Sequence, residues 1–279
     1  MNGPARLEVR ELVVSFGGLT AVDDLSMTVQ PGDIVGLIGS NGSGKTTLLD
    51  AVSGLVPAAS GTVLVDDEDL ADYLPEERAA FGVVRSFQEC RLFPELSVED
   101  TLLITEDARK SSDVLSATMH LPWARRVERA KRKAVDGVIA SFGLEQFRYH
   151  QTRHLSTGTR RVVDLAAIVL ARPRLLLLDE PTAGIAQREA EAFIPLLRRL
   201  QEVTGATVLI VEHDVPLVFE LCSTVVVMQT GKVVASGPPE AVRRDRKALD
   251  AYLGASDEAL LASGPLEGAA DQSPGRAGP

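Results

Sequence analysis

The sequence predicts an α/β fold in which buried strands carry a phosphate-binding site. Three observations support this prediction. A glycine-rich loop with a lysine stands between an apolar strand and a helix, and a second apolar strand ends in two adjacent carboxylates. The stretch from Ser97 to about Phe147 has helical periodicity and no clear strand. Together these patterns predict a sheet with flanking helices and an added helical region.

The glycine-rich loop spans Gly39–Thr47 and matches the pattern G-x-x-x-x-G-K-[ST]. The apolar segment Ile34–Ile38 before it is typical of a buried strand, and Leu48–Val52 after it is typical of a helix. A strand, a loop and a helix in this order are the context that the motif requires. A chance glycine-rich turn would not match both the fixed positions and the flanking periodicity.

The residue types in this loop suit a bound triphosphate. Gly42 and Gly44 can adopt positive φ and leave backbone N–H groups open to an anion. The helix that follows directs its positive end at the phosphates. Lys45 adds a mobile charge, and the hydroxyl of Thr46 can bind Mg²⁺. The residues predicted to bind nucleotide here are Gly39, Ser40, Asn41, Gly42, Ser43, Gly44, Lys45, Thr46 and Thr47.

Composition places the chain among ordinary globular proteins. It has 279 residues, of which 45% are hydrophobic and 24% charged, with a net charge of −10. This negative charge argues against a general nucleic-acid-binding protein. Two cysteines give no disulfide framework, so a reducing cytoplasm is the simple interpretation. The first six residues lack a signal-peptide core, and no uncharged apolar run approaches the ~20 residues that cross a bilayer.

Further strands are predicted on both sides of the helical region. On its N-terminal side they are Leu7–Val14, Leu25–Val29, Thr62–Val65 and Gly82–Gln88. On its C-terminal side, two apolar segments flank Thr230-Gly231 as a hairpin. The tail from Ala255 to Pro279 is rich in Gly, Ala, Ser and Pro, so we expect it to be disordered.

The helical region contains a basic run at Arg125–Lys133. A solvated helix face is the favoured interpretation. Attraction to anionic headgroups on the cytoplasmic side of a membrane comes second, and DNA binding comes third because of the overall charge. Gly143 fits a helix stop near the end of this region.

The second chemical motif is the apolar segment Leu175–Leu178 followed by Asp179 and Glu180. A carboxylate at the end of a buried parallel strand faces the ligand site of an α/β sheet. Asp179 would hold Mg²⁺ through water, and Glu180 could polarise an attacking water as a general base. Two solvated acids would be the alternative, but the motif becomes specific in series with the phosphate loop. His213 follows another apolar strand, Thr207–Val211.

With these motifs in order, Leu7 to Gly254 resembles the ATP-binding subunits of ABC transporters. The resemblance implies a P-loop NTPase (RecA-like) α/β core with an N-terminal antiparallel β region and an inserted α-helical subdomain. The implied cassette spans 1–254, with a core of about 1–88 and 162–254, a helical subdomain of about 89–161, and a tail of 255–279. It also implies roles for Phe16 (adenine stacking), Gln88 (Q-loop, nucleotide and metal), Ser156, Gly158 and Thr159 (signature), Asp179 (metal), Glu180 and His213 (catalysis).

Some stretches resemble particular subfamilies of ABC ATPases. Arg85–Gln88 with Arg91–Val98, and the ending Tyr252–Gly254, are similar to ATPases of branched-chain amino-acid importers. The cassette of lipopolysaccharide exporters is similar too, and a low-turnover regulatory subunit is a third interpretation. Chromosome-maintenance ATPases are excluded, because Lys45 and Leu155 are too close in sequence for their long coiled coils.

The chain departs from the family at two places. Thr157 and Thr159 stand where the signature L-S-G-G-Q has Gly and Gln, and Ala183–Ala186 lacks the usual D-loop Asp. We therefore expect a site complete in its own half and altered in the half lent to a partner.

The family mechanism implies a set of partners and a location. Two cassettes, of the same or related chains, would sandwich two ATP molecules with Mg²⁺. Permease subunits would dock near Gln88 and the helical subdomain, and a periplasmic or extracellular solute-binding protein would act indirectly. The implied location is peripheral, on the cytoplasmic face of a bacterial cell membrane.

Overall fold

The computed structural model describes residues 3–86, 92–109, 122–185 and 190–253. It contains two sheets. The antiparallel sheet has the order β2-β1-β4-β5, and the larger sheet has the order β10-β9-β3-β8-β7-β6. The strands are β1 (Leu7–Phe16), β2 (Leu19–Val29), β3 (Ile34–Gly39), β4 (Ser60–Val65), β5 (Glu68–Asp69), β6 (Val83–Arg85), β7 (Leu175–Asp179), β8 (Thr207–Val211), β9 (Thr224–Gln229) and β10 (Lys232–Gly237).

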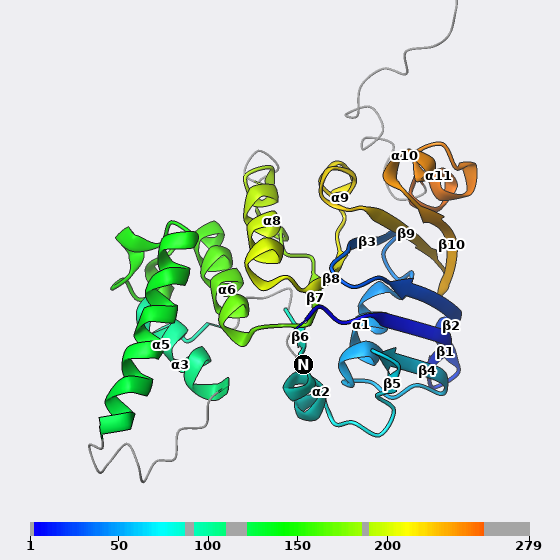
Figure 1. The fold of residues 1–279 in the computed structure, drawn as a ribbon. Helices are drawn as coiled ribbons and strands as arrows, with labels where there is room; N and C mark the ends of the chain where they lie inside the picture. The colour runs from blue at the N-terminus through cyan, green and yellow to red at the C-terminus, as the bar shows by residue number, and fades with distance from the viewer. Residues whose placement is uncertain (1–2, 87–91, 110–121, 186–189, 254–279) are drawn as a thin grey trace, which may run out of the picture.

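The helices cover and extend the larger sheet (Figure 1). Helices α3, α5 and α6 form one side of the molecule, and α8 and α9 lie over the sheet beside them. The helices are α1 (Lys45–Ser53), α2 (Pro75–Phe81), α3 (Val98–Arg109), α5 (Pro122–Ser141), α6 (Thr157–Ala171), α8 (Phe193–Thr204), α9 (Val215–Leu221), α10 (Pro239–Val242) and α11 (Arg246–Leu253). Short 3-10 helices span Glu145–Phe147 and Thr152–His154.

The central strands are parallel and buried, as their continuous apolar runs predict. Strand β3 pairs in parallel with β8 and β9, and β8 pairs in parallel with β7. All five residues of β7 and of β8 are buried. This order brings the carboxyl ends of β3 and β7 to the same edge of the sheet, two strands apart, which is where α/β sheets bind ligands.

Two hydrophobic cores lie on opposite faces of the larger sheet. One fills the space between the two sheets and includes Leu48, Leu49 and Val52 of α1. The other joins the sheet to α5, α6, α8 and α9 through residues such as Val163 and Ile194. Helix α1, which starts at the glycine-rich loop, contacts strands of both sheets. The loop is therefore anchored by a helix held between two sheets.

The sequence-based fold class is confirmed, with differences at element ends. Strand β2 begins at Leu19 rather than Leu25, because the strand continues past an irregular pairing near Asp24, where φ is +54°. The apolar spacing in the sequence predicts a helix from Arg160 to Ala171, and α6 begins earlier, at Thr157, because Ser156 caps it. The sequence also predicts a helix from about Gln187 to Gln201. It appears as α8, which ends later, at Thr204, and the first residues of the predicted range lie outside the described residues.

Several expectations concern residues that the structure does not describe, or segments at their edge. Gln88, Ala186 and the tail 255–279 lie outside the described residues, so the disorder of the tail and the domain limits stay predictions. The basic run lies on α5, and its residues from Arg126 to Arg129 are exposed. None of the helices in the described part of the chain combines the length and apolar character that a membrane-spanning segment needs.

Candidate nucleotide site

The glycine-rich loop connects the end of β3 to the start of α1. Gly42 and Gly44 adopt φ values of +78° and +100°, the positive φ predicted from the sequence. A Cβ on Gly44 would lie 2.2 Å from the carbonyl oxygen of Ala21, so no side chain fits there. Two neighbouring segments contact the loop. One is the backbone at Ala21, beside Gly44, and the other is Gly231, whose N–H donates to the Ser43 carbonyl oxygen at 3.0 Å. The result is a rigid backbone turn at the N-terminus of a buried helix.

Lys45 lies within this turn. Its side chain is buried, and Nζ donates to the carbonyl oxygens of Gly39 (2.9 Å) and Ser40 (3.0 Å). Burial lowers the pKa of Lys45, while the nearby charges of Glu180 and Asp179 raise it. The structure thus brings the loop lysine into one electrostatic environment with Asp179, the predicted metal ligand, and Glu180, the predicted general base, although they are far apart in sequence.

Asp179 ends β7 and is almost fully buried, with 2% of its surface exposed. Its Oδ2 accepts a hydrogen bond from Arg85 at 2.9 Å, and its backbone N–H donates to Ser86 Oγ at 3.2 Å. Burial raises the pKa of Asp179, and the hydrogen bond from Arg85 opposes that rise. Among the described residues, none gives Oδ1 a hydrogen-bond partner.

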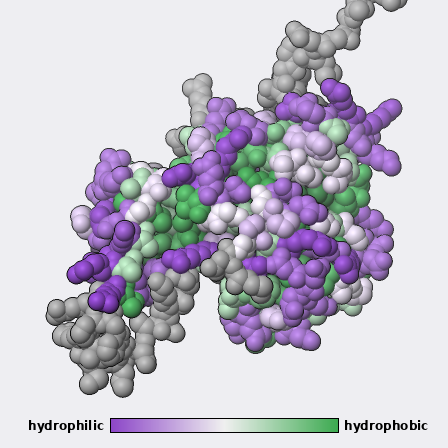
Figure 2. Space-filling view, in the orientation of Figure 1, coloured by the Kyte–Doolittle hydropathy of each residue, from purple (hydrophilic) through white to green (hydrophobic). Residues whose placement is uncertain are grey.

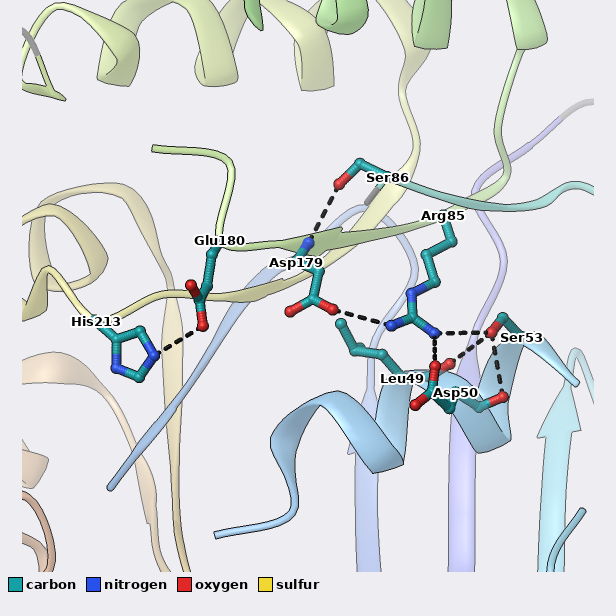
Figure 3. A network of polar contacts seen from close by, with 8 residues as sticks. All are labelled: Leu49, Asp50, Ser53, Arg85, Ser86, Asp179, Glu180 and His213. Atoms are coloured by element: carbon teal, nitrogen blue, oxygen red, sulfur yellow. Dashed lines mark hydrogen bonds and ion pairs between the residues drawn. The ribbon is translucent and has the colours of Figure 1, made fainter. Parts of the chain in front are cut away.

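The unpartnered oxygen of Asp179 fits a hard cation. Figure 3 shows Oδ2 directed at Arg85 and the other carboxylate oxygen directed away from it, on the side of Glu180. Mg²⁺ prefers oxygen ligands and usually keeps several waters. A buried carboxylate oxygen, with the Thr46 hydroxyl in the first turn of α1, is a suitable donor set.

Glu180 has an unusual backbone conformation. Its φ is +47°, in the left-handed region that non-glycine residues rarely adopt, and such conformations gather at functional sites. Its N–H donates to the Val211 carbonyl oxygen at 2.9 Å. Its Oε1 lies 2.8 Å from Nε2 of His213 (Figure 3). Both side chains border a cavity of about 210 Å³, in which a small reactant could be held.

Glu212 links two functional segments that sequence reasoning treated separately. Its buried carboxylate accepts from the Thr182 N–H (2.8 Å), from the Thr182 hydroxyl (2.6 Å) and from the His213 N–H (3.1 Å). Burial raises the pKa of Glu212, and the hydrogen bonds from Thr182 lower it. This residue therefore ties the segment after Glu180 to the segment that carries His213.

The signature residues lie at the start of α6, on a different part of the molecule. Ser156 caps the helix and accepts from the Thr159 N–H at 3.1 Å, and its Oγ is 2.9 Å from Thr159 Oγ1. No hydrogen bond or ion pair within the described residues joins Ser156–Thr159 to the glycine-rich loop. Phe16, at the end of β1, is 48% exposed. The structure thus leaves both predicted contact groups open to an outside molecule.

A groove of about 1220 Å³ runs between the sheet and the helical side of the molecule. It is lined by β6, by the C-terminal ends of α2, α6 and α8, and by residues of α3 and α5. Figure 2 shows hydrophobic residues gathered across the middle of the molecule, between more hydrophilic outer surfaces. Arg85 borders the groove and also contacts Asp179, so the groove and the carboxylate site are adjacent.

Comparison with known families shows which family the chain belongs to. Residues 22–183 match the family model "ABC transporter", and residues 232–258 match the model "Branched-chain amino acid ATP-binding cassette transporter". The chain belongs to the ABC transporter ATP-binding family. It is an ATPase subunit, with the P-loop NTPase fold that its two sheets and helical side display.

Individual relatives cover nearly the whole cassette. The chain is 33% identical to the high-affinity branched-chain amino acid transport ATP-binding protein LivG of Escherichia coli, over 89% of this chain and 97% of that one. It is also 33% identical to the lipopolysaccharide export system ATP-binding protein LptB of Escherichia coli, over 90% and 98%. The ADP conformation of the cassette MJ1267 superposes with a TM-score of 0.75 at 27% identity, over 90% and 99%. The MJ1267 structure supports nucleotide binding by this cassette.

Two functional contacts escaped sequence reasoning. The sequence analysis names Arg85 only within the stretch Arg85–Gln88 that resembles the importer ATPases. An arginine at the end of an apolar strand is nevertheless a usable signal, because a buried arginine is normally paired with an acid. Glu212 directly follows the buried strand β8, and such a position predicts a buried acid with a nearby donor. The donor that Glu212 contacts is Thr182, and its position depends on the path of the chain after Glu180. No local sequence pattern predicts that path.

Proposed function

We propose that this ATPase subunit drives the import of a branched-chain amino acid or a related small solute. The observation that carries the proposal is the match of residues 232–258 to the branched-chain family model, beside the likeness to LivG. The equal identity to LptB favours a second candidate, an exporter of lipid or lipopolysaccharide type.

Uptake by living cells separates the two candidates. In a strain that lacks this chain, we expect slower uptake of radiolabelled leucine, isoleucine or valine, restored by the wild-type gene and not by a Lys45→Ala gene. Normal uptake of all three amino acids, together with altered cell-surface lipopolysaccharide, would instead identify the exporter. Normal behaviour in both assays would contradict both candidates.

A third candidate is a subunit that binds nucleotide and turns it over slowly. The observation that favours it is the engaged signature serine, whose hydroxyl lies 2.9 Å from that of Thr159. The Glu180–His213 pair favours an active enzyme. Phosphate release by the isolated protein, measured with and without its membrane partners, decides between them.

We infer that the glycine-rich loop binds the phosphates of ATP and that Thr46 and Asp179 hold Mg²⁺. The loop residues Gly39–Thr47 supply backbone N–H groups and the Lys45 charge, and Phe16 offers an aromatic face for adenine. The bound Mg²⁺ would neutralise phosphate charge and polarise the phosphoryl oxygens. Gln88, which lies outside the described residues, would complete the nucleotide and metal contacts.

Glu180 is the proposed general base of ATP hydrolysis. A carboxylate can accept a proton from the attacking water, and general-base catalysis contributes roughly 10²–10⁴-fold. His213, 2.8 Å away, would hold the carboxylate in a fixed orientation. The left-handed backbone at Glu180 supports this role, because it turns the side chain out of the strand path toward the cavity shared with His213.

A second cassette is the proposed partner for the signature residues. Ser156, Gly158 and Thr159 lie at the N-terminus of α6, where the positive end of the helix suits the γ-phosphate of an ATP bound to another subunit. The absence of any described link to the loop of the same chain supports this arrangement. The partner would be a second copy or a related chain, with ATP as the bridging ligand.

Permease subunits are the proposed occupants of the groove. The groove adjoins β6, which leads to Gln88, and it is bordered by the helical side of the molecule. Docking there would place this subunit at the cytoplasmic face of the membrane, with a solute-binding protein acting on the opposite side. No role for nucleic acid is proposed, in line with the net charge of −10.

A further inference from the structure

Arg85 is a buried arginine that joins three elements. It ends β6, and only 7% of its side chain is exposed. One guanidinium NH₂ group donates to Asp179 Oδ2 at 2.9 Å, and the other contacts the Asp50 carboxylate and lies 3.3 Å from Ser53 Oγ (Figure 3). A planar guanidinium holds two acceptors in a fixed relative geometry, which a lysine does not do.

The two elements that Arg85 connects are the ones that carry the proposed Mg²⁺ ligands. Asp50 lies on α1, whose first turn contains Thr46, and Asp179 ends β7. The arginine occupies only Oδ2 of Asp179, while Oδ1 has no hydrogen-bond partner among the described residues. A carboxylate with one oxygen fixed can present the other in a single direction.

We propose that Arg85 is a positioning residue for the metal: it orients Asp179 toward Mg²⁺ and is itself held by Asp50. This proposal rests on the proposed metal role of Asp179. Groups that orient metal ligands typically change metal affinity by 10- to 100-fold when they are removed. Arg85 contributes no metal contact of its own, because a guanidinium has no acceptor atom.

A purely structural clamp between α1 and β7 is the competing interpretation, and the chain offers a matched control. Arg78 is also buried and also holds α1, through hydrogen bonds from its NH1 to the carbonyl oxygens of Ala51 (2.8 Å) and Val52 (3.0 Å). Within the described residues, its guanidinium donates to backbone carbonyl oxygens and not to Asp179. Loss of Arg78 should therefore loosen α1 without reorienting the carboxylate.

The test measures Mn²⁺ binding to the protein–ADP complex by electron paramagnetic resonance, with the full chain in excess over ADP. ADP avoids hydrolysis, and Mn²⁺ replaces Mg²⁺ as the visible ion. We expect Arg85→Gln to weaken Mn²⁺ binding about 10-fold or more, with ADP affinity in EDTA changed less than about twofold. Arg85→Lys should be intermediate, because it keeps the charge and loses the two-pronged geometry. Arg78→Gln should lower the melting temperature and leave Mn²⁺ affinity unchanged.

Equal Mn²⁺ affinity in Arg85→Gln and Arg78→Gln would overturn the proposal and leave Arg85 as a structural clamp. Asp179→Asn separates this failure from failure of the proposed function, since unchanged Mn²⁺ affinity in that variant would remove Asp179 itself from the metal site. If Arg85→Gln does not fold, Arg85→Lys and Asp50→Asn decide the question. Weaker Mn²⁺ binding in both supports the proposal, and unchanged binding in both refutes it.

Discussion

At the scale of single residues, the site combines two buried cations, Lys45 and Arg85, with the carboxylates of Asp179 and Glu180. Lys45 lies near Asp179 and Glu180, and burial lowers the pKa of Lys45 and raises that of Asp179. The proposed Mg²⁺ would lie on the side of Asp179 Oδ1, the oxygen that has no hydrogen-bond partner among the described residues. This arrangement of charges supports the proposed binding of a metal-bound polyphosphate.

Phe16 gives a prediction at this scale. An aromatic face offers stacking area for a base with little selectivity, so Phe16→Ala should weaken ATP and GTP binding alike, by about 1–3 kcal/mol. Leu19→Ala is a matched control, because Leu19 lies across the same turn and is also exposed. Calorimetric titration with both nucleotides measures the effect. Unchanged affinity in Phe16→Ala, or an equal loss in Leu19→Ala, would remove Phe16 from the site.

At the scale of elements, α6 carries both the altered signature and a partly buried acid, Asp164. The hydroxyl of Thr159 lies 2.9 Å from that of Ser156. In the proposed pair of cassettes, the Ser156 hydroxyl would instead contact the ATP of the partner. Asp164, two turns further on, lies 3.9 Å from Arg161, and burial raises its pKa from 3.8 to about 6. The first feature bears on turnover and the second on stability, so they can be tested separately.

Restoring the usual signature tests the first feature. The double change Thr157→Gly and Thr159→Gln removes the hydroxyl that engages Ser156, so we expect phosphate release to stay the same or to rise. Thr157→Gly alone is the control, since the Thr157 hydroxyl lies 3.5 Å from Arg160 Nη2 and the Ser156 hydroxyl contacts Thr159 instead. A collapse of turnover in the double variant would show that the threonines have a role of their own.

The pH dependence of stability tests the second feature. Because the folded pKa of Asp164 is raised, its proton favours the folded state below about pH 4, and that contribution is lost as the pH rises through 6. Relative to Asp164→Asn, the unfolding free energy of the wild type should therefore fall by up to about 3 kcal/mol between about pH 4 and pH 7. Denaturant unfolding of both proteins at several pH values measures this. A difference that does not vary with pH would contradict a raised pKa for the partly buried Asp164 carboxyl.

The sequence predicted elements better than their contacts. Period and motif predicted the strands β3, β7 and β8 and the glycine-rich loop, because each is encoded by neighbouring residues. The contacts of Arg85 and Glu212 depend on which strands become neighbours, and Arg85 meets Asp179 only because β6 pairs with β7. Local patterns also misplaced the starts of β2 and α6, where an irregular pairing and a helix cap decide the boundary.

At the scale of the whole molecule, one sheet connects two surfaces. On one of its faces α1 is held between two sheets, and on the other the helical side of the molecule forms a groove. Strand β6 borders the groove and ends at Arg85, which contacts Asp179. Arg85 would therefore stand between an occupant of the groove and the Asp179 carboxylate. This adjacency suits a subunit that couples ATP hydrolysis to a membrane partner.

The central claim is that Glu180 activates water in a site closed by a second cassette, and Glu180→Gln tests it most directly. The change keeps size and hydrogen bonding but removes the base and a negative charge near the γ-phosphate. We expect the variant to lose roughly 10²–10⁴-fold of its turnover and to form an ATP-dependent dimer that persists, since Lys45 and the loop are untouched. Size-exclusion chromatography with ATP and Mg²⁺, beside a phosphate-release assay, measures both properties. Near-normal hydrolysis would contradict the assignment of the base, and lost hydrolysis without any association would contradict the shared site.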